Sequence, residues 1–135
     1  MTNSPLFLDT SGLHCLFDIG NSRYEKAAGL FRESRSLFTT NYVLAEFIPL
    51  THARRLRRES ALKFLETLTV LPRLQLIWID ETTHARAMYL LENRLDKTYS
   101  LCDAVSFVVM RERGIMDALT TDKHFEQEGF VRLLA

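Results

Sequence analysis

The sequence predicts an α/β fold, a three-layer α/β/α sandwich in which helices cover both faces of a short, mostly parallel five-stranded sheet. Short apolar runs of strand length alternate with helical stretches along the chain. These runs are continuously apolar, as expected for strands buried on both faces. The 135 residues suit one domain, and no repeat or linker divides them, so residues 1–135 are expected to form a single domain.

In the first half of the chain, apolar spacing predicts two strands and four helices. The strands are 6–8 and 37–39, and the helices are 12–17, 22–34, 41–48 and 57–68. Asn41 is expected to cap the third of these helices. Pro49 has no backbone N–H group, so it is expected to bend or stop that helix just after Ile48.

The second half predicts three more strands and two longer helices. The strands are 74–79, 118–121 and 130–133. Asp80 is expected to cap a helix that runs to about Leu95. Ser100 opens a helix that continues to Arg113, and Gly114 ends it. Right-handed crossovers would place the carboxyl ends of parallel strands at one edge of the sheet.

The composition excludes several classes of protein. Apolar residues make up 47% and charged residues 25% of the chain, as in ordinary globular proteins. The formal net charge of zero means that any site for a polyanion must be a local patch. Neither a signal peptide nor a bilayer-length apolar run is present, so a cytoplasmic protein without a membrane partner is expected. Cys15 and Cys102 have no metal-site spacing and are expected to be reduced and packed.

Four acidic residues lie where a strand passes into a helix or in the first turns of a helix: Asp9, Glu46, Asp103 and Asp122. The carboxyl ends of parallel strands border the ligand crevice of an open sheet, so these side chains are expected to converge. Several carboxylates in one place repel each other unless a cation or protons neutralise them. Oxygen ligands of this kind suit Mg²⁺ or Mn²⁺.

Each acid taken alone also has a structural explanation. Asp9 can begin the turn into the first helix, and Asp122 can cap a helix that starts at Lys123. Asp103 follows Ser100 at the spacing of a capping box. Glu46 can be a solvated helix residue, although its apolar neighbours favour a functional role, because an unpaired charge is costly to bury. The joint pattern therefore carries the prediction of a site.

Small hydroxyl residues accompany the acids: Thr10, Ser11, Ser100 and Thr121. Such hydroxyls can orient metal-bound water or donate to a phosphate, but helix capping explains Ser100 equally well. The four histidines form no zinc-binding pattern. His124 follows Asp122 closely enough to reach a substrate, but a surface position is the expectation.

A run of basic residues is the second feature with two interpretations: Arg54, Arg55, Arg57 and Arg58. Arginines in such a cluster can bind RNA phosphates or an acidic partner. They can equally form a solvated connection between two helices. The sequence leaves both interpretations open.

Four motifs in order together resemble the PIN domain family, and the last resembles its VapC-type toxins. They are Leu-Asp-Thr-Ser-Gly, Thr-Asn-Tyr-Val-Leu-Ala-Glu-Phe, Ser-Leu-Cys-Asp-Ala-Val-Ser-Phe and Leu-Thr-Thr-Asp-Lys-His-Phe. The resemblance spans essentially the whole chain and implies a metal-dependent ribonuclease. It implies catalytic acids at Asp9, Glu46, Asp103 and Asp122, with one or two Mg²⁺ or Mn²⁺ ions held mainly by the three aspartates. It also implies an RNA substrate, a small antitoxin as partner, and a homodimer.

Three other functions compete with a toxin ribonuclease. A PIN nuclease can process RNA without being a toxin. A non-catalytic domain can bind RNA or act as a scaffold through the arginine run. A phosphotransfer domain can also have an aspartate after its first strand, but the dehalogenase-like class needs a second aspartate two positions after Asp9, where this chain has Ser11.

Overall fold

The strands form one sheet that is parallel throughout. The structure is a computed structural model that describes residues 2–135. Its strands are β1 (Leu6–Leu8), β2 (Leu37–Thr40), β3 (Leu74–Ile77), β4 (Asp117–Leu119) and β5 (Val131–Arg132). They lie in the order β3-β2-β1-β4-β5, and every neighbouring pair is parallel. β1 is therefore central, and the residue that follows it enters the middle of the carboxyl edge.

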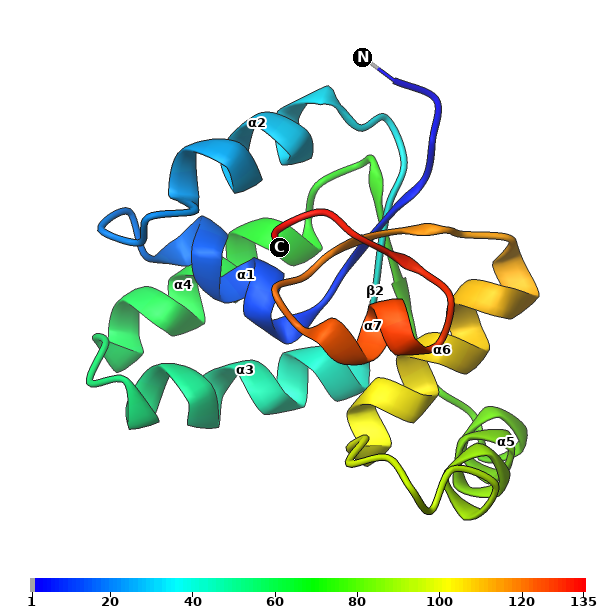
Figure 1. The fold of residues 1–135 in the computed structure, drawn as a ribbon. Coiled ribbons are helices and arrows are strands. Elements are labelled where there is room, and N and C mark those ends of the chain that lie inside the picture. The colour runs from blue at the N-terminus through cyan, green and yellow to red at the C-terminus, as the bar shows by residue number, and fades with distance from the viewer. Residues whose placement is uncertain (1) are drawn as a thin grey trace.

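Helices cover both faces of this sheet, which confirms the predicted three-layer α/β/α architecture. The helices among residues 2–135 are α1 (Thr10–Phe17), α2 (Tyr24–Glu33), α3 (Asn41–Ala53), α4 (Arg58–Thr69), α5 (Glu81–Glu92), α6 (Leu101–Arg113) and α7 (Lys123–Gln127). In Figure 1, α5 and α6 lie on one side of the strands, and α1, α2 and α4 lie on the other. α6 is buried along 102–110, so it forms much of the core.

Helix α3 differs from the prediction at both ends. It continues through Pro49 to Ala53, although proline removes a backbone donor. Buried side chains on both sides of the proline, Phe47 and Thr51, hold the helix against the core and outweigh that loss. The cap is Thr40, whose hydroxyl accepts from the Val43 N–H group at 3.2 Å. The predicted cap Asn41 instead accepts from the Ile79 N–H group at 2.8 Å, which ties α3 to the end of β3.

Other element ends shift by a few residues. The predicted strands 74–79, 118–121 and 130–133 are shorter than expected, and α5 ends at Glu92 rather than near Leu95. The Asp80 cap is confirmed, because its carboxylate accepts from the Thr83 N–H group at 2.8 Å. Gly114 ends α6 in the left-handed region with φ 66°, also as predicted.

Helix α1 lies directly against β4. A Cβ atom added to Gly12 would lie 1.9 Å from the carbonyl oxygen of Leu119, so only glycine permits this approach. The contact brings the start of α1, which follows Asp9, close to the end of β4.

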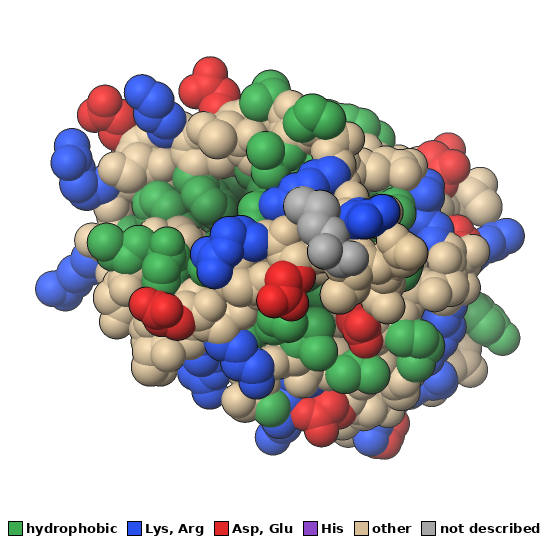
Figure 2. Space-filling view, turned by 90° about the horizontal axis from the view of Figure 1, so that it is seen from above, with side chains coloured by type: hydrophobic (Ala, Val, Ile, Leu, Met, Phe, Trp, Pro, Cys, Tyr) green, Lys and Arg blue, Asp and Glu red, His purple; other side chains and the backbone are tan. Residues whose placement is uncertain are grey.

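The cysteines and the surface agree with the composition. Cys15 and Cys102 are both free and buried, as predicted. Figure 2 shows the face on the side of the N-terminus, where basic, acidic and apolar side chains are interspersed. Within residues 2–135, none of the helices combines the length and the apolar character that crossing a bilayer requires.

Candidate active site

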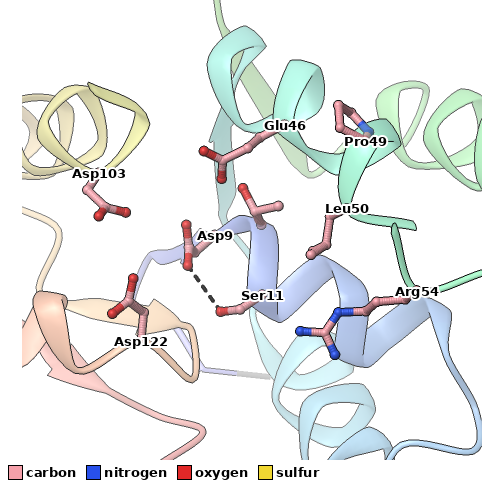
Figure 3. A pocket seen from close by; sticks show the side chains of 9 residues that line it. Asp9, Ser11, Glu46, Pro49, Leu50, Arg54, Asp103 and Asp122 are labelled. Carbon is pink, nitrogen blue, oxygen red and sulfur yellow. Dashed lines mark hydrogen bonds between the residues drawn. The ribbon is translucent and has the colours of Figure 1, made fainter. Parts of the chain in front are cut away.

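The four acidic residues that the sequence singles out line one cleft at the carboxyl edge of the sheet. Asp9 follows β1, Glu46 lies in α3, Asp103 lies in the first turn of α6, and Asp122 precedes α7. The cleft has a volume of about 400 Å³. In Figure 3 the four carboxylates point toward a common space from four separate elements. Residues far apart in sequence thus meet through the topology.

Asp9 is the most deeply buried of these acids, at 4% exposure. Its Oδ2 accepts hydrogen bonds from the hydroxyls of Thr120 at 2.7 Å and Ser11 at 3.1 Å. Burial raises the pKa of Asp9 to about 7, and the charge of Asp103 adds to this rise, whereas the Thr120 hydrogen bond opposes it. Asp9 is therefore held in place but is poorly compensated in its charged form.

Asp103 is held by the capping box at the start of α6. Its Oδ2 accepts from the Ser100 N–H group at 3.0 Å, and the Ser100 hydroxyl accepts from the Asp103 N–H group at 3.0 Å. His124 Nδ1 lies 3.1 Å from the same Oδ2. Burial raises the pKa of Asp103, and the nearby charge of Asp122 raises it further.

Glu46 differs from the three aspartates in its hydrogen bonding. Each aspartate has one carboxylate oxygen fixed by hydrogen bonds, and in Asp122 this is Oδ1, which accepts from the His124 N–H group at 2.9 Å. Among the described residues, no hydrogen bond reaches the Glu46 carboxylate, and its side chain is exposed at the rim of the cleft. Three carboxylates are therefore positioned and one is free to reorient.

The hydroxyl residues occupy different places around Asp9. Ser11 contacts both Asp9 and Thr120, whereas Ser100 acts as the cap of α6. The hydroxyl that reaches Asp9 from β4 belongs to Thr120 rather than to Thr121, whose N–H group donates to Ser11 Oγ at 3.0 Å. The Thr10 Oγ1 atom is buried at the cleft and has no hydrogen-bond partner among the described residues.

Sequence reasoning missed Thr120 because it chose Thr121, the threonine directly before Asp122. Side chains alternate between the two faces of an extended segment, so of two adjacent threonines only one points toward Asp9. Thr120 is fully buried at 0% exposure, which marks it as the inward member of the pair. A one-residue comparison of which threonine follows the apolar run would have found it.

The expectation that His124 lies at the surface is wrong. Its side chain is 18% exposed, and its Nδ1 lies 3.1 Å from Asp103 and 3.3 Å from Asp122. One atom from each of these three residues falls within 4.8 Å of the others, a spacing that can surround a metal ion. The spacing of the motif Asp-Lys-His in a helix start was the available signal.

Of the four clustered arginines, Arg54 is the one that lines the cleft. It lies across from Ser11, beyond Leu50 (Figure 3). The side chain of Arg57 is 81% exposed and lies 4.0 Å from a carboxylate oxygen of Glu59, so it faces solvent. The arginine run is thus divided between the cleft and the outer surface.

The donor set of the cleft fits a hard divalent cation. Carboxylate oxygens are the ligands that Mg²⁺ and Mn²⁺ prefer, and Asp103 and Asp122 each keep one oxygen that no described residue engages. The raised pKa values of Asp9 and Asp103 show that the protein alone does not neutralise their charges. The residues present therefore fit a metal centre.

A parallel sheet with carboxylates gathered at its carboxyl edge, beneath helices on both faces, defines the class of PIN-like metal-dependent nucleases. The family model described as "PIN domain" matches residues 6–130, and this chain belongs to that family. Because PIN domains are metal-dependent nucleases, the chain is an enzyme of the hydrolase class.

Curated relatives and solved structures extend the similarity over nearly the whole chain. The chain is 30% identical over 129 residues to the 23S rRNA-specific endonuclease VapC20 of Mycobacterium tuberculosis, covering 95% of this chain and 97% of the relative. The crystal structure of VapC20, described as a sarcin-ricin loop cleaving toxin, is similar with a TM-score of 0.84 and 28% identity, covering 93% and 96% of the two chains. VapBC2 of Rickettsia felis, bound to promoter DNA, shares the fold alone, with a TM-score of 0.64, 15% identity, and 95% and 96% coverage.

Proposed function

We propose that this protein is a Mg²⁺- or Mn²⁺-dependent endoribonuclease that hydrolyses RNA phosphodiester bonds as the toxin of a type II toxin–antitoxin pair. The observation that carries the proposal is the convergence of Asp9, Glu46, Asp103 and Asp122 in one cleft. A non-catalytic RNA-binding domain would gain nothing from four carboxylates that repel an RNA phosphate. With a divalent ion present, the carboxylates would bind the ion, and the ion would bind that phosphate.

The chain's residues divide into those that hold the ion and one that handles a proton. One or two ions would be bound by three aspartates, Asp9, Asp103 and Asp122. In each of them one carboxylate oxygen accepts hydrogen bonds, which orients the other oxygen toward the ion. An ion held by these residues would lower the pKa of a water molecule and would stabilise charge on the phosphate and on the leaving oxygen. Glu46, which no described residue fixes, accepts the proton of the attacking water. Water attacks the phosphorus in place of the 2′-hydroxyl and the 3′ oxygen leaves, so the products carry a 5′-phosphate and a 3′-hydroxyl.

RNA binding requires positive charge close to an acidic cleft. Arg54 is the arginine of the run that lines the cleft, so it binds a phosphate next to the one that is cut. Arg55, Arg57 and Arg58 lie farther out and contribute a weaker, long-range attraction. Pro49 and Leu50 supply an apolar surface between the acids and Arg54, against which a ribose or base can pack.

The curated relative supports a proposal for the substrate class. VapC20 is named a 23S rRNA-specific endonuclease and matches 95% of this chain, which supports ribosomal RNA as the substrate here. A protein with that substrate would act in the cytoplasm, and we propose this location. A small antitoxin would inhibit it, and a homodimer is the proposed assembly. Exposed aromatic side chains near α5, Trp78 at 73% and Tyr89 at 69%, offer a surface for such contacts.

Cleavage mapping tests this proposal. Purified protein is incubated with ribosomal RNA with Mg²⁺, with EDTA, and as Asp9→Asn, and the new 5′ ends are sequenced. We expect discrete 5′-phosphate ends with Mg²⁺ only, and a loss of cleavage of at least about 100-fold for the folded Asp9→Asn variant. Cleavage that persists in EDTA would contradict the mechanism. Cleavage without growth arrest on expression would instead indicate an RNA-processing enzyme that is not a toxin.

A further inference from the structure

We propose that His124 is a positioning residue that holds the Asp103 carboxylate in its metal-binding orientation through an Nδ1–H hydrogen bond. The inference rests on the proposed metal-dependent function, and it assigns a role to a residue outside the four acids. It concerns how the site is preorganised, and not which groups touch the ion.

His124 contacts both acids at the end of the cleft. Its Nδ1 lies 3.1 Å from Asp103 Oδ2, and its backbone N–H group donates to Asp122 Oδ1 at 2.9 Å. One residue therefore links the start of α6 to the start of α7 through their carboxylates. A displacement of this residue would move two proposed ligands together.

The imidazole ring is fixed on two further sides. Its Nε2 lies 3.0 Å from the hydroxyl of Thr98, and the ring of Tyr99 packs edge-on at a centroid distance of 5.2 Å. Tyr99 donates its hydroxyl to Glu128 at 3.1 Å, and Arg94 donates to the same carboxylate at 2.6 Å. The loop that carries Thr98 is thus anchored, so the ring has a defined orientation.

The chemistry of the partners determines the direction of these hydrogen bonds. A metal ligand must be ionised, and an ionised carboxylate only accepts hydrogen bonds, so Nδ1 is the donor toward Asp103. The Thr98 hydroxyl can then donate to Nε2. The proton on Nδ1 is therefore the feature of the ring on which the contact with Asp103 depends.

The consequence is a carboxylate with one occupied and one free oxygen. Asp103 Oδ2 receives donors from both Ser100 and His124. No hydrogen bond within the described part of the chain reaches Oδ1, which remains available for the ion. Partners of this kind in metal sites typically change metal affinity by about 10- to 100-fold when removed.

A matched pair of amide variants tests the donor position. In His124→Asn the amide nitrogen can occupy the place of Nδ1, whereas in His124→Gln it reaches the place of Nε2 and leaves Asp103 Oδ2 with the Ser100 donor alone. We expect Mn²⁺ affinity, measured by calorimetry without RNA, to fall by about 10- to 100-fold in His124→Gln. In His124→Asn it should stay within about threefold of the wild type, on the same reasoning. RNA binding without metal should be unchanged in both.

A further variant distinguishes loss of the ring's orientation from a folding defect. Thr98→Val removes the partner of Nε2 without altering the ring, and we expect a smaller loss of Mn²⁺ affinity, of about threefold, with an unchanged melting temperature. Equal affinity in all variants would overturn the positioning role. Equal loss in both amide variants, together with nitrogen coupling in the Mn²⁺ paramagnetic resonance spectrum, would show that His124 is a direct ligand and would also overturn it. If the two amide variants differ in Mn²⁺ affinity as expected but the wild type cuts no RNA, the nuclease proposal alone would be refuted.

Discussion

At the scale of single residues, burial opposes the charge that the cleft needs. Asp9 is almost inaccessible and its pKa is raised to about 7, so near neutral pH a large part of it is protonated in the metal-free protein. The hydroxyl of Thr120 favours the ionised form because it donates to Oδ2 at 2.7 Å. Among the hydrogen bonds that favour the ionised form of Asp9, this one has the largest effect, ahead of those from the Thr10 backbone and the Ser11 hydroxyl.

Thr120→Val tests the effect of this hydrogen bond. Loss of the hydroxyl should raise the pKa of Asp9 further, so the activity–pH profile should shift toward alkaline pH. Cleavage should fall by about tenfold near neutral pH and recover at higher pH, since one pKa unit corresponds to about 1.4 kcal/mol. Thr121→Val is the matched control, because the Thr121 hydroxyl makes no contact with Asp9. Equal profiles for the two variants would contradict this role of Thr120.

Arg54 can be tested against its neighbour Arg57. Arg54→Ala should weaken binding of an uncut RNA, and the slope of log affinity against log salt should decrease by about one unit, as for one lost phosphate contact. Arg57→Ala should leave the slope nearly unchanged, because that side chain lies outside the cleft. Fluorescence anisotropy in EDTA over a range of salt measures both. A larger effect in Arg57→Ala would place the RNA on the outer surface.

Local contacts of single residues could be predicted from the sequence, whereas long-range contacts could not. The Ser100–Asp103 capping box was readable because its spacing is local. Thr120 and His124 were misjudged because their roles depend on which face of a short segment meets Asp9 or Asp103. Those contacts join residues 111 and 21 positions apart, so no local pattern encodes them.

At the scale of elements, close packing of α1 on β4 determines the geometry around Asp9. Gly12 lies against the Leu119 carbonyl with no room for a side chain. Asp9 precedes α1 and Thr120 follows β4, so any separation of the two elements would lengthen the hydrogen bond between these residues. The packing of α1 on β4 thus determines the length of the hydrogen bond between Thr120 and Asp9.

Gly12→Ala should therefore reduce both stability and activity. The added methyl group would overlap a backbone atom that cannot rotate away, so we expect a loss of at least about 3 kcal/mol in the free energy of unfolding. Gly29→Ala in α2 is the control, because nothing lies within 4 Å of its added Cβ. That variant should gain about 0.5–1 kcal/mol, since alanine favours the helix. Urea denaturation measures both changes, and a Gly12→Ala protein as stable as the wild type would contradict the packing argument.

The elements also explain why their ends were harder to predict than their order. Pro49 was expected to bend or stop α3 after Ile48, but burial of Thr51 beyond it stabilises another turn. Trp78 and Ile79 lie outside β3 despite their apolar character, because the neighbouring strand β2 ends at Thr40, which pairs with Ile77. Tertiary contacts decide these boundaries, whereas apolar periodicity sufficed for the element order.

At the scale of the whole molecule, the parallel topology concentrates four carboxylates in one cleft, where Arg54 is the one arginine among the described residues that line it. The net charge is zero, yet one edge of the sheet gathers four carboxylates. Desolvation and mutual repulsion there must lower the stability of the metal-free fold whenever the carboxylates are ionised. An ion bound at this edge would reverse the effect, so stability should depend jointly on pH and metal.

Asp9→Asn should expose this dependence. The pKa of Asp9 lies above its ordinary value of 3.8, at about 7, so the folded state binds more protons than the unfolded state between these values. The stability that protonation of Asp9 provides is complete below the lower value and is lost as pH rises through the upper one. Wild type should therefore lose on the order of 4 kcal/mol relative to Asp9→Asn between about pH 4 and about pH 8.

Metal binding should offset much of this loss of stability in the wild type but not in Asp9→Asn. At 100 times its dissociation constant, Mg²⁺ should stabilise the wild type by about 2.7 kcal/mol at alkaline pH. It should have little effect on Asp9→Asn, which lacks the central carboxylate of the cleft. Urea denaturation at the two pH values, with Mg²⁺ and with EDTA, measures all four differences. A wild type whose stability relative to the variant is independent of pH would show that folding does not raise the pKa of Asp9, and the electrostatic account of the cleft would be wrong.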